Sequence, residues 1–199
     1  MYTGDLRFDL FINALWMGWN LLLAAIPFVL ALYLFQQHKR ISLSWSLGFS
    51  VFFLFLPNAP YVLTDLVHLS RVLPELSSRK ELVLWIGQFS LFLLVGFILF
   101  YESVRRLEKF LLRKKYLKYQ SFFRLGTFFV VSTGVYIGRF LRFNSWDLFT
   151  QPRLVLNSFR YLNDIPVILF VISFTIGLFA LYFLFEKFTQ RLHEPLALH

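Results

Sequence analysis

The sequence predicts an all-α integral membrane protein, a transmembrane bundle of about five helices with short interfacial helices. Two observations indicate this class. Of the 199 residues, 58% are hydrophobic, 27 are phenylalanine and only 16% are charged, which is more apolar surface than one soluble domain buries. The charged residues are also separated by long apolar runs, each close to the roughly 20 residues that a spanning helix needs.

Four charge-free runs predict four of the spans directly. They lie at residues 10–38, 41–64, 82–101 and 165–185. A fifth span is predicted around residues 119–138, of which only 125–138 are free of charge. Arg124 must therefore extend its charged end toward the lipid headgroups if this helix is to reach full length. No internal repeat divides the chain, so residues 1–199 are expected to form a single integral-membrane domain.

Composition also excludes several function classes. The chain has no cysteine, so disulfides, thiolate metal sites and thiol catalysis are excluded. The first apolar run is too long for the core of a signal peptide, and it is expected to remain as a helix. The Lys/Arg cluster at residues 105–118 directly follows a predicted span and has no binding fold around it. We therefore expect contact with anionic membrane lipids and no nucleic-acid partner.

The distribution of Lys and Arg predicts an orientation. Of the 20 Lys and Arg residues, eight lie in segments on the same side as the N-terminus and twelve lie on the other side. Positive charge prefers the cytoplasm. The sequence thus predicts a multi-pass protein of the cell membrane, with its N-terminus outside and its C-terminus cytoplasmic.

A first polar motif, FLPNAPYVLTDLVHLSR at residues 55–71, ends the second apolar run. Pro57 and Pro60 each remove a backbone donor and clash with the preceding turn, so the second span is predicted to end or kink at residues 55–58. A new helix is predicted to begin near Pro60, with Asn58 close to its N-cap. In this helix, polar residues at spacings of three and four share one face: Tyr61, Thr64, Asp65, His68 and Arg71.

This polar face has two interpretations. The simpler one is an interfacial helix at the outer membrane boundary with its polar side in water. The second is a functional site, because Asp, His and Tyr on one face are chemically more varied than solvation requires.

A second polar motif, YIGRFLRFNSWD at residues 136–147, ends the fourth predicted span. Arg139 and Arg142 are neighbours on a helix, and the residues after them are typical of a turn. In the five-span topology both motifs lie on the outer side. The arginines could serve only as membrane anchors. Alternatively, Asp65 and His68 could converge with Arg139, Arg142 and Asp147 into a polar pocket whose charges compensate one another.

Together the two motifs resemble those of the bacterial integral-membrane family catalogued as domain of unknown function 1361, over nearly the whole chain. The resemblance implies a polytopic bacterial membrane protein whose polar motifs follow the second and fourth spans, and it implies no activity. That family commonly has tryptophan after the second arginine, where this chain has Phe143. The matching positions are Leu56, Pro57, Asn58, Ala59, Pro60, Tyr61, Thr64, Asp65, His68, Gly138, Arg139, Arg142, Asn144, Trp146 and Asp147.

Three function classes remain open. The preferred hypothesis is a structural or assembly role, in which the polar cluster fastens two outer loops to the bundle. The first alternative is a membrane enzyme or a binder of an anionic lipid headgroup. His68 would then be a general base oriented by Asp65, and the arginines would hold a phosphate. Ser145 is a conceivable nucleophile, but its sequence context does not mark it as activated. The second alternative, a transporter or channel, would use the same ionisable groups as a gate or proton relay.

These hypotheses define the candidate site residues. Asp65 and His68 are the catalytic candidates, and although they could ligate a metal, two ligands are weak grounds for it. We therefore predict no metal site and no cofactor, with membrane lipids as partners and a small-molecule or lipid ligand possible. The candidate ligand-binding residues are Asn58, Tyr61, Thr64, Arg139, Arg142, Asn144 and Asp147.

Three smaller features are predicted to be structural. Asn20 lies inside the first span, where an amide usually bonds to a neighbouring helix. Glu102 has Arg105 and Arg106 three and four residues further on, a spacing that predicts a local ion pair. Residues 152–163 are expected to form a short helix on the membrane surface.

Overall fold

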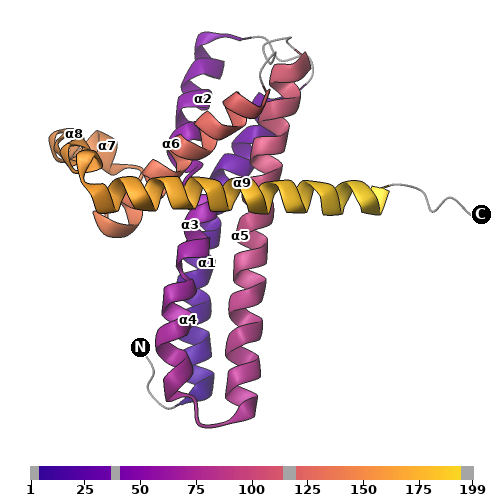
Figure 1. Ribbon diagram of the computed structural model, residues 1–199, viewed down its shortest axis with the longest axis vertical. Coiled ribbons are helices and arrows are strands. Elements are labelled where there is room, and N and C mark those ends of the chain that lie inside the picture. The colour runs from indigo at the N-terminus through magenta and orange to yellow at the C-terminus, as the bar shows by residue number, and fades with distance from the viewer. Residues whose placement is uncertain (1–4, 37–40, 114–119, 194–199) are drawn as a thin grey trace, which may run out of the picture.

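All the regular secondary structure is helical in the residues that the computed structural model describes, which are 5–36, 41–113 and 120–193 (Figure 1). The long helices are α1 (Leu6–Leu34), α2 (Leu43–Phe55), α5 (Arg79–Arg113), α6 (Gln120–Phe140) and α9 (Ile165–His193). The short helices are α3 (Asn58–Thr64), α4 (Leu66–Val72), α7 (Asp147–Thr150) and α8 (Pro152–Ser158), with 3₁₀ turns η1 (Leu73–Glu75) and η2 (Phe159–Asn163).

Five helical stretches are long and apolar enough to cross a membrane. They are Leu6–Leu34, Leu43–Glu75, Arg79–Arg113, Gln120–Phe140 and Ile165–Arg191. The predicted fold class, an all-α protein with about five spans, is thereby confirmed. The second stretch is composite, because it contains α2, α3, α4 and η1 in succession.

Two sets of helices cross one another. In Figure 1, α1 and α5 run along the long axis of the molecule, and α2, α3 and α4 follow one another beside them. Helices α6 and α9 pack against each other, and α9 lies across the long axis. At the crossing the ring of Tyr101 on α5 lies 4.8 Å from the ring of Tyr182 on α9. The hydropathy of the sequence does not indicate this crossing.

The prolines of the first motif break the second span where the sequence predicted. Helix α2 ends at Phe55 and α3 begins at Asn58, with Pro57 rather than Asn58 as its N-cap. The chain then continues beside α1 and α5 instead of turning onto a surface. Val62 is buried against Gly96 of α5, where an added Cβ would lie 2.8 Å from a Val62 methyl carbon. Asp65 on the polar face of this helix is completely buried, so the interpretation in which that whole face lies in water does not hold.

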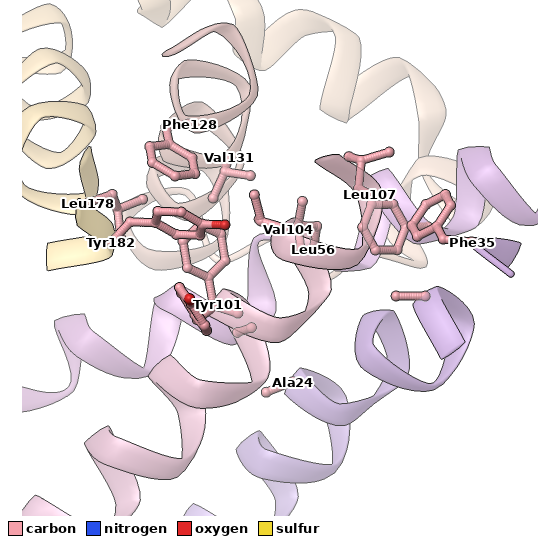
Figure 2. Close-up of a cluster of buried hydrophobic side chains, with 14 of the residues drawn as sticks. Ala24, Phe35, Leu56, Tyr101, Val104, Leu107, Phe128, Val131, Leu178 and Tyr182 are labelled. Carbon is pink, nitrogen blue, oxygen red and sulfur yellow. The ribbon is translucent and has the colours of Figure 1, made fainter. Parts of the chain in front are cut away.

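Aromatic and branched side chains fill the space between the two sets of helices. Figure 2 shows Phe128 and Val131 of α6 on one side of this core and Leu178 and Tyr182 of α9 beside them. Val104 of α5 also belongs to it and is fully buried. This shared core attaches the α6–α9 pair to α5, and it places the end of α6 next to α3.

Candidate functional site

An ion pair joins the two polar motifs. Nη1 of Arg139 at the end of α6 donates to Oδ1 of Asp65 at 2.7 Å. Asp65 is completely buried, and the Arg139 side chain is only 16% exposed. The guanidinium also donates to the Tyr61 hydroxyl at 3.3 Å and to the carbonyl oxygen of Thr64 at 3.4 Å. The predicted convergence of Asp65 with Arg139 is confirmed, whereas a role in binding or catalysis stays a prediction.

The Asp65 carboxylate is only half satisfied. The short contact from Arg139 reaches Oδ1, while Oδ2 is buried and has no hydrogen-bond partner among the described residues. The pair is thus held by one short bond and not by the two parallel bonds that Arg and carboxylate can form. A buried carboxylate oxygen without a partner is costly, so this pair is not optimised for stability alone.

His68 completes the cluster on the next turn. Its Nε2 lies 3.2 Å from Nη2 of Arg139 and 3.9 Å from Oδ1 of Asp65. Arginine has only donors, so His68 Nε2 must accept this hydrogen bond and the ring proton must be on Nδ1. The His68 ring also packs against the ring of Trp16, with ring centres 5.1 Å apart and the two planes at 71°. Nε2 is therefore occupied and is not free to act as a base.

The cluster lies beside the middle of the charge-free run 82–101 of α5. Trp16 contacts both His68 and Phe92 of α5, with ring centres at 5.1 Å and 5.8 Å. Val62 packs against Gly96, and Asp65 follows Val62 by three residues. Asp65 therefore lies beside the part of α5 between Phe92 and Gly96. The sequence placed the cluster at the end of the spans, because it took the prolines as the point where the chain leaves the bundle.

The remaining charges of the second motif do not join this cluster. Arg142 is exposed and has a φ of 59°. Asp147 accepts from the backbone N–H of Asn144 at 2.6 Å, from the Asn144 amide at 3.3 Å and from the Thr150 hydroxyl at 3.3 Å. These bonds fold the turn between α6 and α7. The predicted pocket containing Asp65, Arg142 and Asp147 together is therefore not formed.

A second link connects the motifs through neutral groups. The Asn58 amide donates to the carbonyl of Phe55 and to the hydroxyl of Ser145, both at 3.0 Å. The Ser145 hydroxyl in turn donates to the carbonyl of Leu54 at 3.1 Å. Its proton is committed to the backbone, so the structure gives no sign of an activated nucleophile.

A cavity of about 760 Å³ opens beside these two links. Its walls come from α1, α2, α3, α6, α7, α8 and α9 and from the turn that follows α6. Most lining side chains are apolar, and none of the lining residues described by the structure is Asp, Glu, Lys, Arg or His. The polar ones are Asn20, Asn58, Tyr61, Thr133, Asn144 and Ser145.

Sequence reasoning missed a second buried charge network. Arg124 of α6 forms two hydrogen bonds to Glu108 of α5, at 2.7 and 2.9 Å, and two to Glu186 of α9, at 3.1 and 3.3 Å. Tyr182 lies under the guanidinium at 4.5 Å and donates to Glu108 at 3.3 Å. The expectation that Arg124 extends to the headgroups is therefore wrong. The sequence offered only a weak signal, because Glu108 and Glu186 stand among other charged residues near the ends of α5 and α9.

Glu102 forms a local ion pair near the C-terminal end of α5. Glu102 pairs with Arg105 at 2.9 Å and lies 3.9 Å from Arg106, as predicted. Across residues 5–36, 41–113 and 120–193, no three His, Asp or Glu side chains are grouped as a metal ion would require.

Fold and site together define a helical protein of the multi-pass membrane class, with a buried Asp–Arg–His cluster beside an apolar cavity. The particular family follows from comparison with known families. The family described as "Protein of unknown function (DUF1361)" matches residues 19–191, and the chain belongs to it. The matched region contains both polar motifs, which confirms the resemblance found in the sequence. No curated protein and no solved structure matches the chain.

Proposed function

We propose that this protein binds an amphipathic, lipid-class molecule within the membrane. The observation that carries the proposal is the cavity of about 760 Å³, which has the size of typical ligand pockets, roughly 300–1,000 Å³. Its composition also fits, because a few polar groups converge on one part of a largely apolar wall. Both motifs contribute to that polar part, through Asn58 and Tyr61 from the first and Asn144 and Ser145 from the second.

The cluster of Asp65, His68 and Arg139 does not line the cavity, but it holds part of the cavity wall in place. Arg139 is paired with Asp65, so its guanidinium is already neutralised and does not line the cavity. Arg142 does not line it either. An anionic headgroup held by both arginines is therefore less well supported than a ligand that meets neutral groups. The ion pair instead fixes Tyr61 and α3, which form part of the wall.

Photo-crosslinking tests the proposal. Membranes containing the full chain are labelled with a fatty acid that carries a diazirine, and the labelled residues are mapped by mass spectrometry. Residues of the cavity wall such as Phe129 and Val171 should be labelled. Ile168→Trp should reduce this labelling by about tenfold, because Ile168 lines the cavity and the larger ring occupies it.

Leu169→Trp is the matched control for this experiment. Leu169 is the next residue of α9, is 59% exposed and does not line the cavity. The Leu169→Trp variant should therefore leave the labelling of the cavity wall unchanged. Equal labelling of Phe129 in both variants would mean that the label reaches the wall from bulk lipid, and the proposal would be withdrawn.

A structural role is the second candidate, and the closed Asp65–Arg139 pair favours it. The pair connects α3 to α6, which are far apart in the sequence. In this version the cluster holds the helices together and no ligand is needed.

We also propose an orientation in a bacterial inner or plasma membrane, with the N-terminus outside and the C-terminus in the cytoplasm. The excess of Lys and Arg on the opposite side from the N-terminus supports it. The N-terminal ends of α1 and α5 lie at the same end of the molecule (Figure 1), which suits a five-span path in either orientation.

A further inference from the structure

We infer that the cavity recognises an uncharged carbonyl oxygen, such as the ester carbonyl of an acylglycerol, through the hydroxyl of Tyr61 and the side-chain amide of Asn20. The inference rests on the proposed function, because it names the head group that the same cavity would take.

Tyr61 connects the charged cluster to the cavity. Its hydroxyl oxygen accepts a hydrogen bond from Nη1 of Arg139 at 3.3 Å, and the same side chain lines the cavity. No acceptor for the proton of this hydroxyl is found among the described residues. A phenol that accepts from a guanidinium becomes a stronger donor, because hydrogen bonds in a chain polarise one another. Tyr61 is therefore positioned to donate to a molecule in the cavity.

Asn20 supplies a second donor from α1. Its Nδ2 atom is buried and has no hydrogen-bond partner among the described residues, although the residue lines the cavity. A buried donor without a partner is unfavourable, and an acceptor on the ligand would satisfy it. The sequence predicted that this amide bonds to a neighbouring helix, and the structure shows no such bond for Nδ2.

Thr133, Ser145, Asn58 and Asn144, which are also polar residues of the wall, each donate a hydrogen bond within the protein. The Thr133 hydroxyl donates to the carbonyl of Phe129 at 3.0 Å. The Ser145 hydroxyl and the amides of Asn58 and Asn144 also donate within the protein.

Among the described side chains of the wall, free donors thus remain on Tyr61 and Asn20 and on Trp19, which is 57% exposed. All of them match an oxygen acceptor. Because none of the described lining side chains has a positive charge, the wall offers no counter-ion for a phosphate or carboxylate.

Two matched probes test this inference on the full chain in detergent. One is a diacylglycerol and the other is its dialkyl ether analogue of equal chain length, which lacks the carbonyls; both carry a diazirine. The concentration that gives half-maximal labelling of the cavity wall is measured for each. The ester should label at about fivefold lower concentration, which is what one to two hydrogen bonds provide.

Variants then assign this preference to the donors. Tyr61→Phe and Asn20→Leu should each reduce the ratio between the two probes, whereas Thr133→Val should preserve it, because the Thr133 hydroxyl bonds within its own helix. The ratio is measured within one variant, so it does not depend on how much of that variant is folded.

The outcomes separate the two proposals. If neither probe labels the cavity wall, the proposed function fails. If both probes label it equally, or if Tyr61→Phe keeps the full preference, only the further inference fails. Displacement of the ester probe by millimolar inorganic phosphate would show an anion site and would also overturn it.

Discussion

Single side chains explain why the two motifs of this protein belong together. Asp65 is buried and touches one strong cation, Arg139, which comes from a helix 74 residues away. Ionisable groups inside an apolar bundle are costly unless they are paired. Each of these residues is therefore tolerated because the other is present, which makes them a unit rather than two independent polar positions.

Removing one partner should expose this dependence. Asp65→Asn leaves the mostly buried Arg139 without a counter-charge, and we expect a loss of about 3 kcal/mol in the free energy of unfolding. The double variant Asp65→Asn with Arg139→Gln should recover much of that loss, because both charges disappear together. Unfolding in detergent, followed by tryptophan fluorescence, measures the effect. Losses that simply add in the double variant would show that the two side chains do not depend on each other.

A close contact between helix α6 and the start of helix α3 shapes the cavity. At Gly134 of α6, an added Cβ would lie 2.5 Å from the ring of Pro57 at the start of α3. Helices can approach this closely where one of them carries a small residue. The contact joins α6 to the proline break, and both Gly134 and Pro57 line the cavity. Backbone proximity and the ion pair therefore act on the same pair of helices.

Alanine at Gly134 should separate these two helices. The proline ring is stiff and cannot move aside, so Gly134→Ala should destabilise the protein by about 1–3 kcal/mol and lower the labelling of the cavity wall. Gly126 of the same helix is the control, since a Cβ there would meet nothing within 4 Å. Gly126→Ala should be neutral or slightly stabilising, because alanine favours helix. Thermal unfolding of both variants decides the matter, and equal behaviour would contradict the packing argument.

The whole molecule combines two crossing sets of helices. Helix α5 has 35 residues and α9 has 29, which correspond to lengths of about 52 Å and 43 Å. Both exceed the apolar thickness of a bilayer, about 30 Å, so each can cross it while tilted or with its ends in the interface. Although α5 and α9 cross one another, both can therefore span the membrane. This requires a membrane normal that points between the two helix axes, so that each helix is tilted.

Chemical labelling tests the proposed orientation. The chain has no cysteine, so single cysteines can be introduced without a background. Ser77→Cys, in the exposed connection before α5, should react with an impermeant thiol reagent added to intact cells. Ser44→Cys, at the exposed start of α2, should react only after the membrane is opened. The reverse pattern would invert the proposed topology.

The candidate site was predictable in part, for reasons that particular residues make clear. Asp65, His68 and Arg139 could be singled out because ionisable groups are rare in apolar runs, and their meeting followed from the need for compensation. Arg142 and Asp147 were grouped with them because charge alone does not distinguish a residue that pairs across helices from one that folds its own turn. Arg124 was assigned to the headgroups because no local pattern links it to Glu108 or Glu186.

The class of this protein and the position of its proline break could be predicted from the amino-acid sequence alone. A long apolar run predicts a span because its side chains transfer favourably into lipid. A proline interrupts a helix because it lacks a backbone donor. Both effects depend little on the rest of the chain. Three features became visible only in the folded chain: α9 crosses α5, Asp65 is buried beside the middle of α5, and Tyr61 connects the ion pair to a cavity. Those features depend on which helix surfaces fit together, and the shape of packed side chains is not written in the periodicity of any one helix.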